Sequence, residues 1–138
     1  SPEIQAKAHG YILNVKLEPC LPEILCDPTS FGEVVRNLLD NAFDATPGGG
    51  AVSVRGYRKN SSAFVLSVRD TGAGVTNPDK DRLFRPFFTT KEKGMGLGLS
   101  FIKRVMDTCG GKIEVQSRVG KGTIFKLTFN FREREPNP

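Results

Sequence analysis

The sequence lacks several features that would place it in a specialised class of protein. It contains no run of about 18 apolar residues, which a membrane-spanning helix requires, and it shows no secretory signal. Its cysteines, Cys20, Cys26 and Cys109, are odd in number and form no CxxC pair. This spacing argues against a disulfide framework and against a zinc site. Unpaired cysteines are typical of the reducing cytoplasm, which is where we expect this chain to reside.

Charge of one sign is not concentrated anywhere in the chain. The net charge is +5, but the Lys and Arg residues are scattered and form no basic block. A basic balance suits an anionic partner such as nucleic acid, a membrane or a phosphorylated ligand, and it also suits a merely solvated surface. Because no nucleic-acid recognition motif or basic stripe is present, we expect no nucleic-acid partner and no membrane contact.

The length and composition fit one globular domain. The chain has 138 residues, of which 38% are hydrophobic and 25% are charged. It begins with Ser1 rather than Met, so we expect it to be an excised piece of a longer protein. We expect the domain to span 1–131 and the charged, proline-bearing stretch 132–138 to be a frayed tail.

Hydrophobic periodicity predicts two long helices among short strands. The predicted strands are 12–17, 24–26, 51–58, 63–69, 112–117 and 123–131, and the predicted helices are 29–45, 79–84 and 97–108. Asp27-Pro28 marks the start of the first helix, and Gly110-Gly111 marks the end of the last. This order predicts an α+β two-layer sandwich, with helices on one face of a mixed, mostly antiparallel sheet.

The two long helices each carry an apolar stripe that we expect to face the sheet. Apolar side chains recur at steps of three and four residues, which is the period of a helix packed on one side. The residues expected to point inward are Phe31, Val34, Val35, Leu38, Ala42 and Ala45 in the first helix, and Leu99, Ile102, Val105 and Met106 in the second.

A polar row lies beside the apolar stripe of the first long helix. Glu33, Asn37, Asn41 and Asp44 follow one another at steps of three and four residues, so they share one side of the helix. Amide and carboxylate oxygens are hard ligands of the kind that Mg²⁺ accepts while it keeps several waters. Taken alone, the row is more typical of a solvated helix face.

Two glycine-containing loops are the next candidates. In 70–74 (DTGAG), a carboxylate at the end of an apolar strand precedes two glycines, so it could accept a hydrogen bond from an exocyclic amine at a pocket floor. A plain turn has the same composition. In 94–100 (GMGLGLS), glycines lead into a helix whose N-terminal N–H groups could bind phosphate. The loop lacks a Gly-Lys-Ser/Thr motif and a βαβ unit, so it is neither a Walker loop nor a dinucleotide fingerprint.

A phenylalanine-rich segment precedes the second glycine loop. Residues 83–91 (LFRPFFTTK) contain three phenylalanines, which we expect to anchor one end of a mobile loop to the core. Lys91 and Lys93 flank the glycines and could contact phosphates.

Together, these motifs resemble a known family. Residues 37–42 (NLLDNA), 70–74, 84–91 and 94–99 are similar, in this order, to the N box, first glycine box, F box and second glycine box of sensor histidine kinases. The segments 110–113 and 120–125 resemble the last hairpin of that family, so the resemblance covers roughly residues 12–131. It implies the Bergerat ATP-binding fold, which gyrase-type topoisomerases, mismatch-repair ATPases and some chaperones share.

The resemblance also implies a Mg-ATP site. Asn41 would ligate Mg²⁺ with Asn37 nearby, Asp70 would accept the adenine amine, and Gly74 and Thr123 would assist, Thr123 through water. Lys91 and the backbone from Gly94 to Leu99 would hold the phosphates. The full set implied for catalysis, nucleotide and metal is Asn37, Asn41, Asp44, Ala45, Asp70, Gly72, Gly74, Val75, Thr90, Lys91, Gly94, Met95, Gly96, Leu97, Gly98, Leu99 and Thr123.

Two departures from the family pattern bear on this expectation. Many members carry a basic residue where this chain has Asp44, and the acidic residue is instead typical of the branch related to nitrogen-regulation sensors. The lid is short, because only residues 91–93 separate the F box from the glycines. We therefore expect Lys91 to supply a phosphate contact that Asp44 cannot.

The resemblance favours a kinase over a hydrolase. ATPases of the gyrase type usually carry a Glu, which activates water, four residues before the Mg-binding Asn, and this chain has Asn37 there. Phosphoryl transfer depends mostly on positioning and charge neutralisation, and a neutral imidazole needs no base. A serine kinase of the anti-sigma-factor type and a non-catalytic ATP-binding module remain the alternatives.

The expected partners follow from the resemblance to kinases of two-component systems. The only histidine, His9, lies in a segment without helix-forming charged neighbours, so we do not expect it to be the phosphoacceptor. The acceptor would lie on a dimeric helical domain of the same parent protein, which would pass the phosphoryl group to a response regulator. We expect the fragment alone to be monomeric and inactive. We expect the parent protein to be a homodimer, which could be anchored in a membrane.

Overall fold

The computed structural model describes residues 11–19, 22–46, 49–80, 82–85 and 98–132. The strands in this part of the chain are β1 (Tyr11–Leu17), β2 (Glu23–Ile24), β3 (Gly50–Arg58), β4 (Ala63–Asp70), β5 (Lys112–Arg118) and β6 (Gly122–Arg132). They pair in the order β1-β3-β4-β6, and both β5 and β2 also pair with β6. β1 runs parallel to β3, while the other pairs are antiparallel. The predicted mixed, mostly antiparallel sheet is confirmed.

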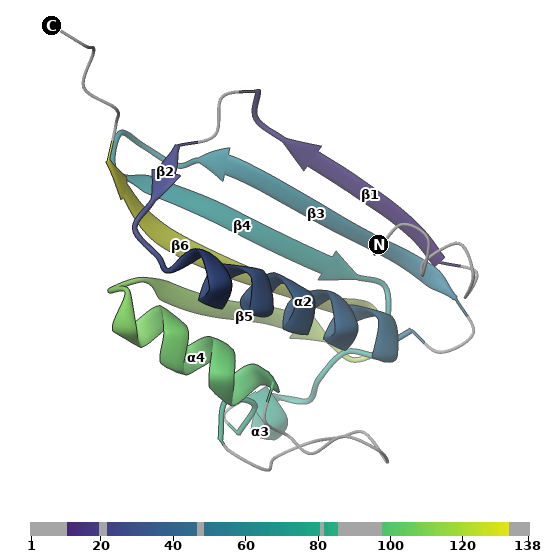
Figure 1. The fold of residues 1–138 in the computed structure, drawn as a ribbon. Coiled ribbons are helices and arrows are strands. Elements are labelled where there is room, and N and C mark those ends of the chain that lie inside the picture. The colour runs from purple at the N-terminus through teal and green to yellow at the C-terminus, as the bar shows by residue number, and fades with distance from the viewer. Residues whose placement is uncertain (1–10, 20–21, 47–48, 81, 86–97, 133–138) are drawn as a thin grey trace, which may run out of the picture.

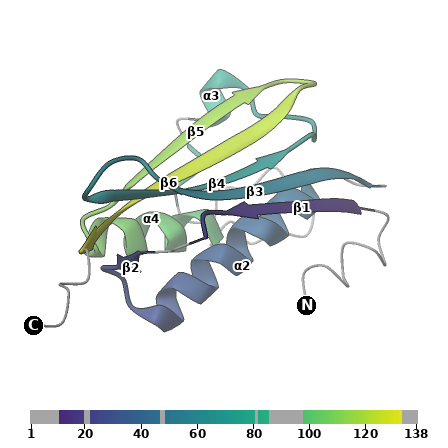
Figure 2. The same ribbon diagram turned by 90° about the horizontal axis from the view of Figure 1, so that it is seen from above.

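Two long helices cover one face of this sheet. α2 (Pro28–Asp44) and α4 (Gly98–Thr108) lie in front of the strands in Figure 1. Figure 2, which views the molecule from above, places both helices on the same side of the sheet. A single turn, α3 (Asn77–Lys80), lies in the connection between β4 and α4. The α+β two-layer sandwich predicted from the sequence is therefore confirmed.

The core lies between the two helices and the inner face of the sheet. The predicted inward residues of both helices are either buried or packed against the buried cluster, apart from Ala45, which is half-buried outside it. The fully buried helical side chains are Val34 and Leu38 of α2 and Ile102 and Met106 of α4. They face alternate residues of the strands, namely Val52, Val54, Phe64, Leu66, Val68, Phe125, Leu127, Phe129 and Phe131. The period-2 pattern of these strands thus gives the sheet one apolar face.

The start of α2 follows from its first residues. The Ser30 N–H donates to Asp27 Oδ2 at 2.9 Å, so Asp27 caps the helix, and Pro28 occupies a first-turn position that needs no N–H donor. At the other end, Thr46 Oγ1 donates to the Ala42 carbonyl at 3.2 Å. These hydrogen bonds set where α2 begins and ends, and the end of α2 lies beside the loop that follows β4.

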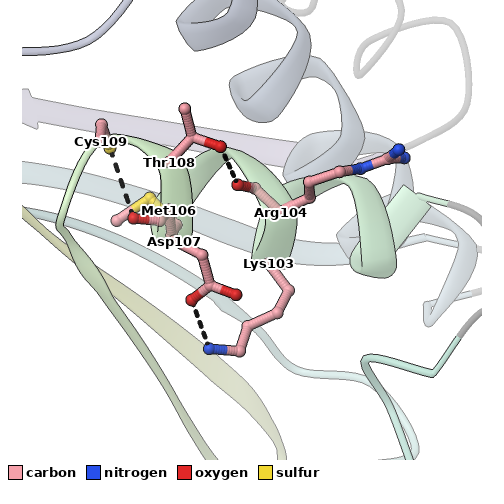
Figure 3. Close-up of polar contacts among 6 residues, drawn as sticks. All are labelled: Lys103, Arg104, Met106, Asp107, Thr108 and Cys109. Atoms are coloured by element: carbon pink, nitrogen blue, oxygen red, sulfur yellow. Dashed lines mark hydrogen bonds and ion pairs between the residues drawn. The ribbon is translucent and has the colours of Figure 1, made fainter.

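The C-terminal end of α4 is shown in Figure 3. Lys103 Nζ donates to Asp107 Oδ1 at 2.7 Å, and Thr108 Oγ1 donates to the Arg104 carbonyl at 2.9 Å. Gly110 has φ 72° and ends the helix in the left-handed conformation, as predicted.

The two described cysteines occupy a structural position near this end of α4. Cys109 is half-buried, and its thiol donates to the Met106 carbonyl at 3.6 Å. Burial, reinforced by the neighbouring Cys109, raises the pKa of the Cys26 thiol to about 11. A thiol with so high a pKa is almost entirely protonated at neutral pH and is therefore a poor nucleophile. Cys109 packs against the buried core, so its side chain fills space at the end of α4.

Three predicted boundaries are wrong. The short helix expected at 79–84 is instead the single turn α3, because the Asp79 N–H donates to Thr76 Oγ1 at 3.3 Å and starts the turn earlier. The expected strand 24–26 is β2 at Glu23–Ile24, whose residues pair with Arg132 and Phe131. This pairing also places Arg132, expected to begin the frayed tail, inside β6.

Candidate functional site

One asparagine of the polar row, Asn37, lies near the start of α4. Asn37 and Asn41 are half-buried on α2, whereas Asp44 is exposed. A Cβ placed on Gly98 would come within 3.6 Å of Asn37 Oδ1, so the first residue of α4 lies directly beside this amide. Glu33, one turn earlier, forms a surface ion pair with Arg36 at 3.6 Å. The structure therefore brings Asn37 together with Gly98, and it leaves Glu33 on the solvent side.

Asp70 is a buried carboxylate at the end of β4. It is 2% exposed, and the Gly72 N–H donates to its Oδ1 at 2.9 Å. Burial raises the pKa of Asp70 above its ordinary value, and backbone hydrogen bonds at Gly72 and Thr123 offset part of that rise. A buried carboxylate of this kind accepts hydrogen bonds strongly, so a base without a matching donor would leave it unpaired.

The loop after Asp70 is held between α2 and the β5–β6 turn. A Cβ on Gly72 would collide with the Ala45 carbonyl oxygen, and the Ala73 N–H donates to that same oxygen at 3.3 Å. Gly74 has φ 78°, and a Cβ there would collide with the Arg118 carbonyl oxygen. Both glycines are therefore required by the close approach of other backbone segments, a reason that was not predicted from the sequence.

A serine that was not among the predicted site residues completes this arrangement. Ser117 Oγ accepts the Val75 N–H at 2.8 Å and lies 2.8 Å from Thr123 Oγ1. Thr123 is 5% exposed and pairs with Asp70 across β4 and β6. Ser117 pairs with Thr123 across β5 and β6. The sequence predicts both strands but no register between them, so it did not identify Ser117.

Positive charge gathers beside this network. A cavity of about 430 Å³ is bordered by Asp70, Ser117 and Thr123. Its cationic lining residues are Arg69, Lys80, Arg118 and Lys121. Basic groups around a recess raise the local concentration of anionic ligands.

Several predicted site residues lie outside the described part of the chain. These are Thr90, Lys91, Gly94, Met95, Gly96 and Leu97, together with the last part of the F box and the whole short lid. Of the second glycine box, Gly98 and Leu99 are described, and they form the first turn of α4. The Ala45 carbonyl accepts the Ala73 N–H from the loop after Asp70, and Val75, at the end of that loop, donates its N–H to Ser117 Oγ.

The close approach at Gly72 makes a testable prediction. Gly72→Ala is expected to lower the free energy of unfolding by about 2 kcal/mol, because the new methyl group meets backbone that cannot move aside. Gly32→Ala is the matched control, since nothing lies within 4 Å of its Cβ position on α2. This control should raise the free energy of unfolding by about 0.8 kcal/mol through helix propensity. Urea denaturation measures both, and equal effects would contradict the packing of this loop.

The fold and the site define an ATPase-type α+β domain. The profile of the family described as histidine kinase-, DNA gyrase B- and HSP90-like ATPase matches residues 26–133. The chain belongs to this family. Within it, the chain is a histidine kinase ATPase domain of the kind found in two-component sensor kinases.

Two curated relatives illustrate the similarity. Sporulation kinase E of Bacillus subtilis (strain 168) is 35% identical over 94% of this chain and 18% of its own length. Sensor histidine kinase ZraS of Escherichia coli (strain K12) is 37% identical over 84% of this chain and 25% of its own length. The chain thus spans between 18% and 25% of the length of these relatives.

Solved structures agree with this assignment. The mycobacterial sensor histidine kinase MprB matches with a TM-score of 0.83 at 27% identity, over 96% of this chain and 88% of that one. Full-length ShkA in complex with AMPPNP matches with a TM-score of 0.83 at 28% identity, over 96% of this chain and 28% of that one. Among the described residues, no helix is both long and apolar enough to cross a membrane.

Proposed function

We propose that this domain binds Mg-ATP and transfers the γ-phosphoryl group to a histidine on a separate helical domain of its parent protein. The proposal is carried by the placement of two features around α2. The loop that follows the buried Asp70 carboxylate is hydrogen-bonded to Ala45 at the end of α2, and Asn37, two turns earlier on the same helix, lies beside Gly98. This arrangement offers an acceptor for the base and hard oxygen ligands near a helix N-terminus. The AMPPNP complex of ShkA, a similar protein, supports ATP as the nucleotide.

Each described residue has a defined task in this proposal. Asp70 accepts the adenine amine, and Gly72 and Gly74 hold the loop after Asp70 in place through their close contacts with the backbone of Ala45 and Arg118. The N–H groups in the first turn of α4, at Gly98 and Leu99, bind phosphate oxygens. Lys91, Thr90 and the glycines from Gly94 are proposed to add further phosphate contacts. Asp44, which is exposed, contributes at the rim of the site.

The donor set of α2 fits Mg²⁺. Magnesium in nucleotide sites takes one or two protein oxygens and completes its shell with phosphates and waters. The Oδ1 atoms of Asn41 and Asn37 would be those protein ligands, with Asn41 the principal one. Bound there, the ion would neutralise charge that develops on the transferring phosphoryl group.

The absence of a carboxylate at position 37 supports transfer rather than hydrolysis. Asn37 cannot act as a general base, so a water molecule at this site would not be activated. A histidine nucleophile needs positioning and charge neutralisation, which Asn41 and the α4 N-terminus would supply. The parent is proposed to be a homodimer, related to the nitrogen-regulation branch, that passes its phosphoryl group to a response regulator.

Two measurements in sequence test this proposal. First, ATP and GTP are titrated into the domain with Mg²⁺ by calorimetry, and only ATP should bind. Second, the domain is incubated with labelled ATP and a dimeric helical domain that carries a phosphoacceptor histidine. Acid-labile label on that histidine supports the kinase. Acid-stable label on a serine would favour the serine-kinase alternative, and ATP binding without any transfer would favour the non-catalytic module.

A further inference from the structure

The outer face of the sheet, on the side away from α2 and α4 in Figure 2, gathers positive charge. Its residues alternate along each strand with the buried residues of the inner face, and the register of the sheet sets them side by side. The charged residues at these outward positions of β1, β3, β4, β5 and β6 as far as Asn130 are Lys16, Arg55, Arg69, Lys112, Arg118, Lys126 and one carboxylate, Glu114. This face therefore carries an excess of positive charge as large as the net charge of +5 of the whole chain.

The cations lie next to one another in the sheet. Lys16 pairs with Arg55 across β1 and β3, and Ser67 of β4 lies between Arg55 and Lys126 in the same row. Like charges at facing positions of neighbouring strands repel each other and lower stability. Folding alone therefore gives no reason for this arrangement, whereas an anionic partner would be attracted to it.

Acidic side chains do little to neutralise this row. Glu114 lies opposite Lys126, but its ion pair joins it to Lys112 at 3.3 Å. Within the described residues, no ion pair joins Arg55, Arg69 or Lys126 to a carboxylate. The described part of the domain therefore does not offset the charge of these three side chains.

The Arg55 guanidinium is restrained in a form that suits a carboxylate. It lies 5.2 Å from the centroid of the Tyr57 ring on the same face, which is a distance typical of a cation–π contact. Restraint of a side chain lowers the entropy that it loses on binding. The planar fork of an arginine can donate two parallel hydrogen bonds to one carboxylate.

The shape and composition of the face favour a polypeptide among anionic partners. The cavity of about 430 Å³ that borders Asp70 extends onto this face, where Arg69, Gln116 and Arg118 line it. A flat bilayer would touch only the rim of such a hollow, whereas a protruding acidic side chain can enter it. Tyr57 is the only aromatic residue at the outward positions, so a single-stranded nucleic acid would lack a platform for base stacking.

We propose that the outer face of the sheet binds a carboxylate-rich segment of a partner protein. This segment pairs with Arg55, Arg69 and Lys126 and extends an acidic side chain into the cavity at Arg118. The surface is distinct from the proposed nucleotide site, since Arg55 and Lys126 lie on the face of the sheet away from the helices.

A labelled polyglutamate peptide is the probe for this surface. Fluorescence anisotropy measures its dissociation constant at about 0.15 M salt, where charges more than about 8 Å apart are largely screened. The test variant is Arg55→Glu with Lys126→Glu. The matched control, Arg36→Glu with Arg104→Glu, makes the same change in net charge at exposed residues of α2 and α4. The test variant should bind the peptide about tenfold more weakly than the wild type, and the control should stay within about twofold of it.

A second measurement uses the wild type alone, so it does not depend on the folding of any variant. In NMR spectra, the peptide should shift the amide resonances of Ser53, Ser67 and Thr128, which occupy outward positions of β3, β4 and β6. The resonances of α2 and α4 should stay unchanged. Shifts confined to α2 and α4 would overturn the proposal.

The remaining outcomes are equally distinct. Equal weakening in both double variants would reduce the effect to net charge and overturn the proposal. Tighter binding of oligothymidylate, or of vesicles that contain phosphatidylglycerol, than of the peptide would assign the face to a nucleic acid or a membrane and would also overturn it. A wild type that binds ATP but not the peptide would overturn this proposal and leave the proposed function intact.

Discussion

Replacement of Asp70 by asparagine is expected to lower the affinity for ATP about a hundredfold. The substitution keeps the shape of the side chain but removes a buried acceptor that is 2% exposed and oriented by the Gly72 N–H. An asparagine amide directed at the adenine amine would set a donor against a donor. Calorimetric titration of ATP measures the loss.

Asp107→Asn is the matched control for this prediction. Asp107 is an exposed carboxylate on α4, and its only described ion pair, with Lys103, is of the surface type that contributes little to stability. The control should bind ATP with wild-type affinity. Unchanged ATP affinity in Asp70→Asn would remove Asp70 from the base-binding site, and with it the main support for adenine specificity.

The pH dependence of ATP binding gives the same prediction an independent readout. Burial raises the pKa of Asp70, so the carboxyl protonates at a higher pH than an ordinary aspartate. ATP affinity should therefore decrease as the pH falls through this raised pKa, and Asp70→Asn should show no such step.

The contribution of Asp70 to folding stability should change with pH in the direction opposite to its contribution to ATP affinity. A carboxyl whose folded-state pKa is raised binds its proton more tightly when folded, so its contribution favours folding at low pH and is lost as the pH rises through the folded pKa. At neutral pH the ionised Asp70 thus opposes folding, and Asp70→Asn should not melt below the wild type. The difference in melting temperature between Asp70→Asn and the wild type should become smaller as the pH falls. This is the behaviour of a group kept for binding rather than for stability.

The sequence predicted the parts of this fold that depend on local chemistry. The start of α2 was correct to within one residue, because the Asp27 cap and Pro28 act within one turn. The end of α4 was correct because Gly110 supplies a left-handed residue. The α3 boundary was wrong, since the Thr76 cap is a weaker signal than an apolar run. Local rules therefore succeed where a residue type allows only one backbone conformation.

The residues of the candidate site also divide into those that local sequence identifies and those that only the three-dimensional packing identifies. Asp70, Gly72 and Gly74 could be identified because a carboxylate followed by two glycines stands out directly after an apolar strand. Ser117 was missed, since a serine in an edge strand is ordinary until the register places it opposite Thr123. The contact between Asn37 and Gly98 depends on the packing of α2 against α4, which no local pattern specifies. Long-range packing therefore decides which of the predicted residues lie together.

Replacement of Asn41 by alanine is expected to abolish the dependence of ATP affinity on Mg²⁺. In the wild type the ion should tighten ATP binding by about tenfold, within the usual range of coupling between two ligands. If Asn41 is the principal protein ligand of Mg²⁺, its loss brings that ratio close to one, while ATP without Mg²⁺ binds nearly as before. Titrations of ATP in Mg²⁺ and in EDTA give the ratio directly.

This ratio distinguishes a metal ligand from a residue that only shapes the helix. A structural effect on α2 would weaken ATP binding equally with and without Mg²⁺, and the ratio would stay near its wild-type value. Asn14→Ala is the matched control, because Asn14 is exposed on the edge strand β1 and should leave both affinities unchanged. By the reciprocity of linkage, ATP must strengthen Mg²⁺ binding by the same factor in the wild type and lose that effect in Asn41→Ala. A preserved ratio in Asn41→Ala would move the metal site from Asn41 to Asn37, the neighbouring amide that lies beside the start of α4.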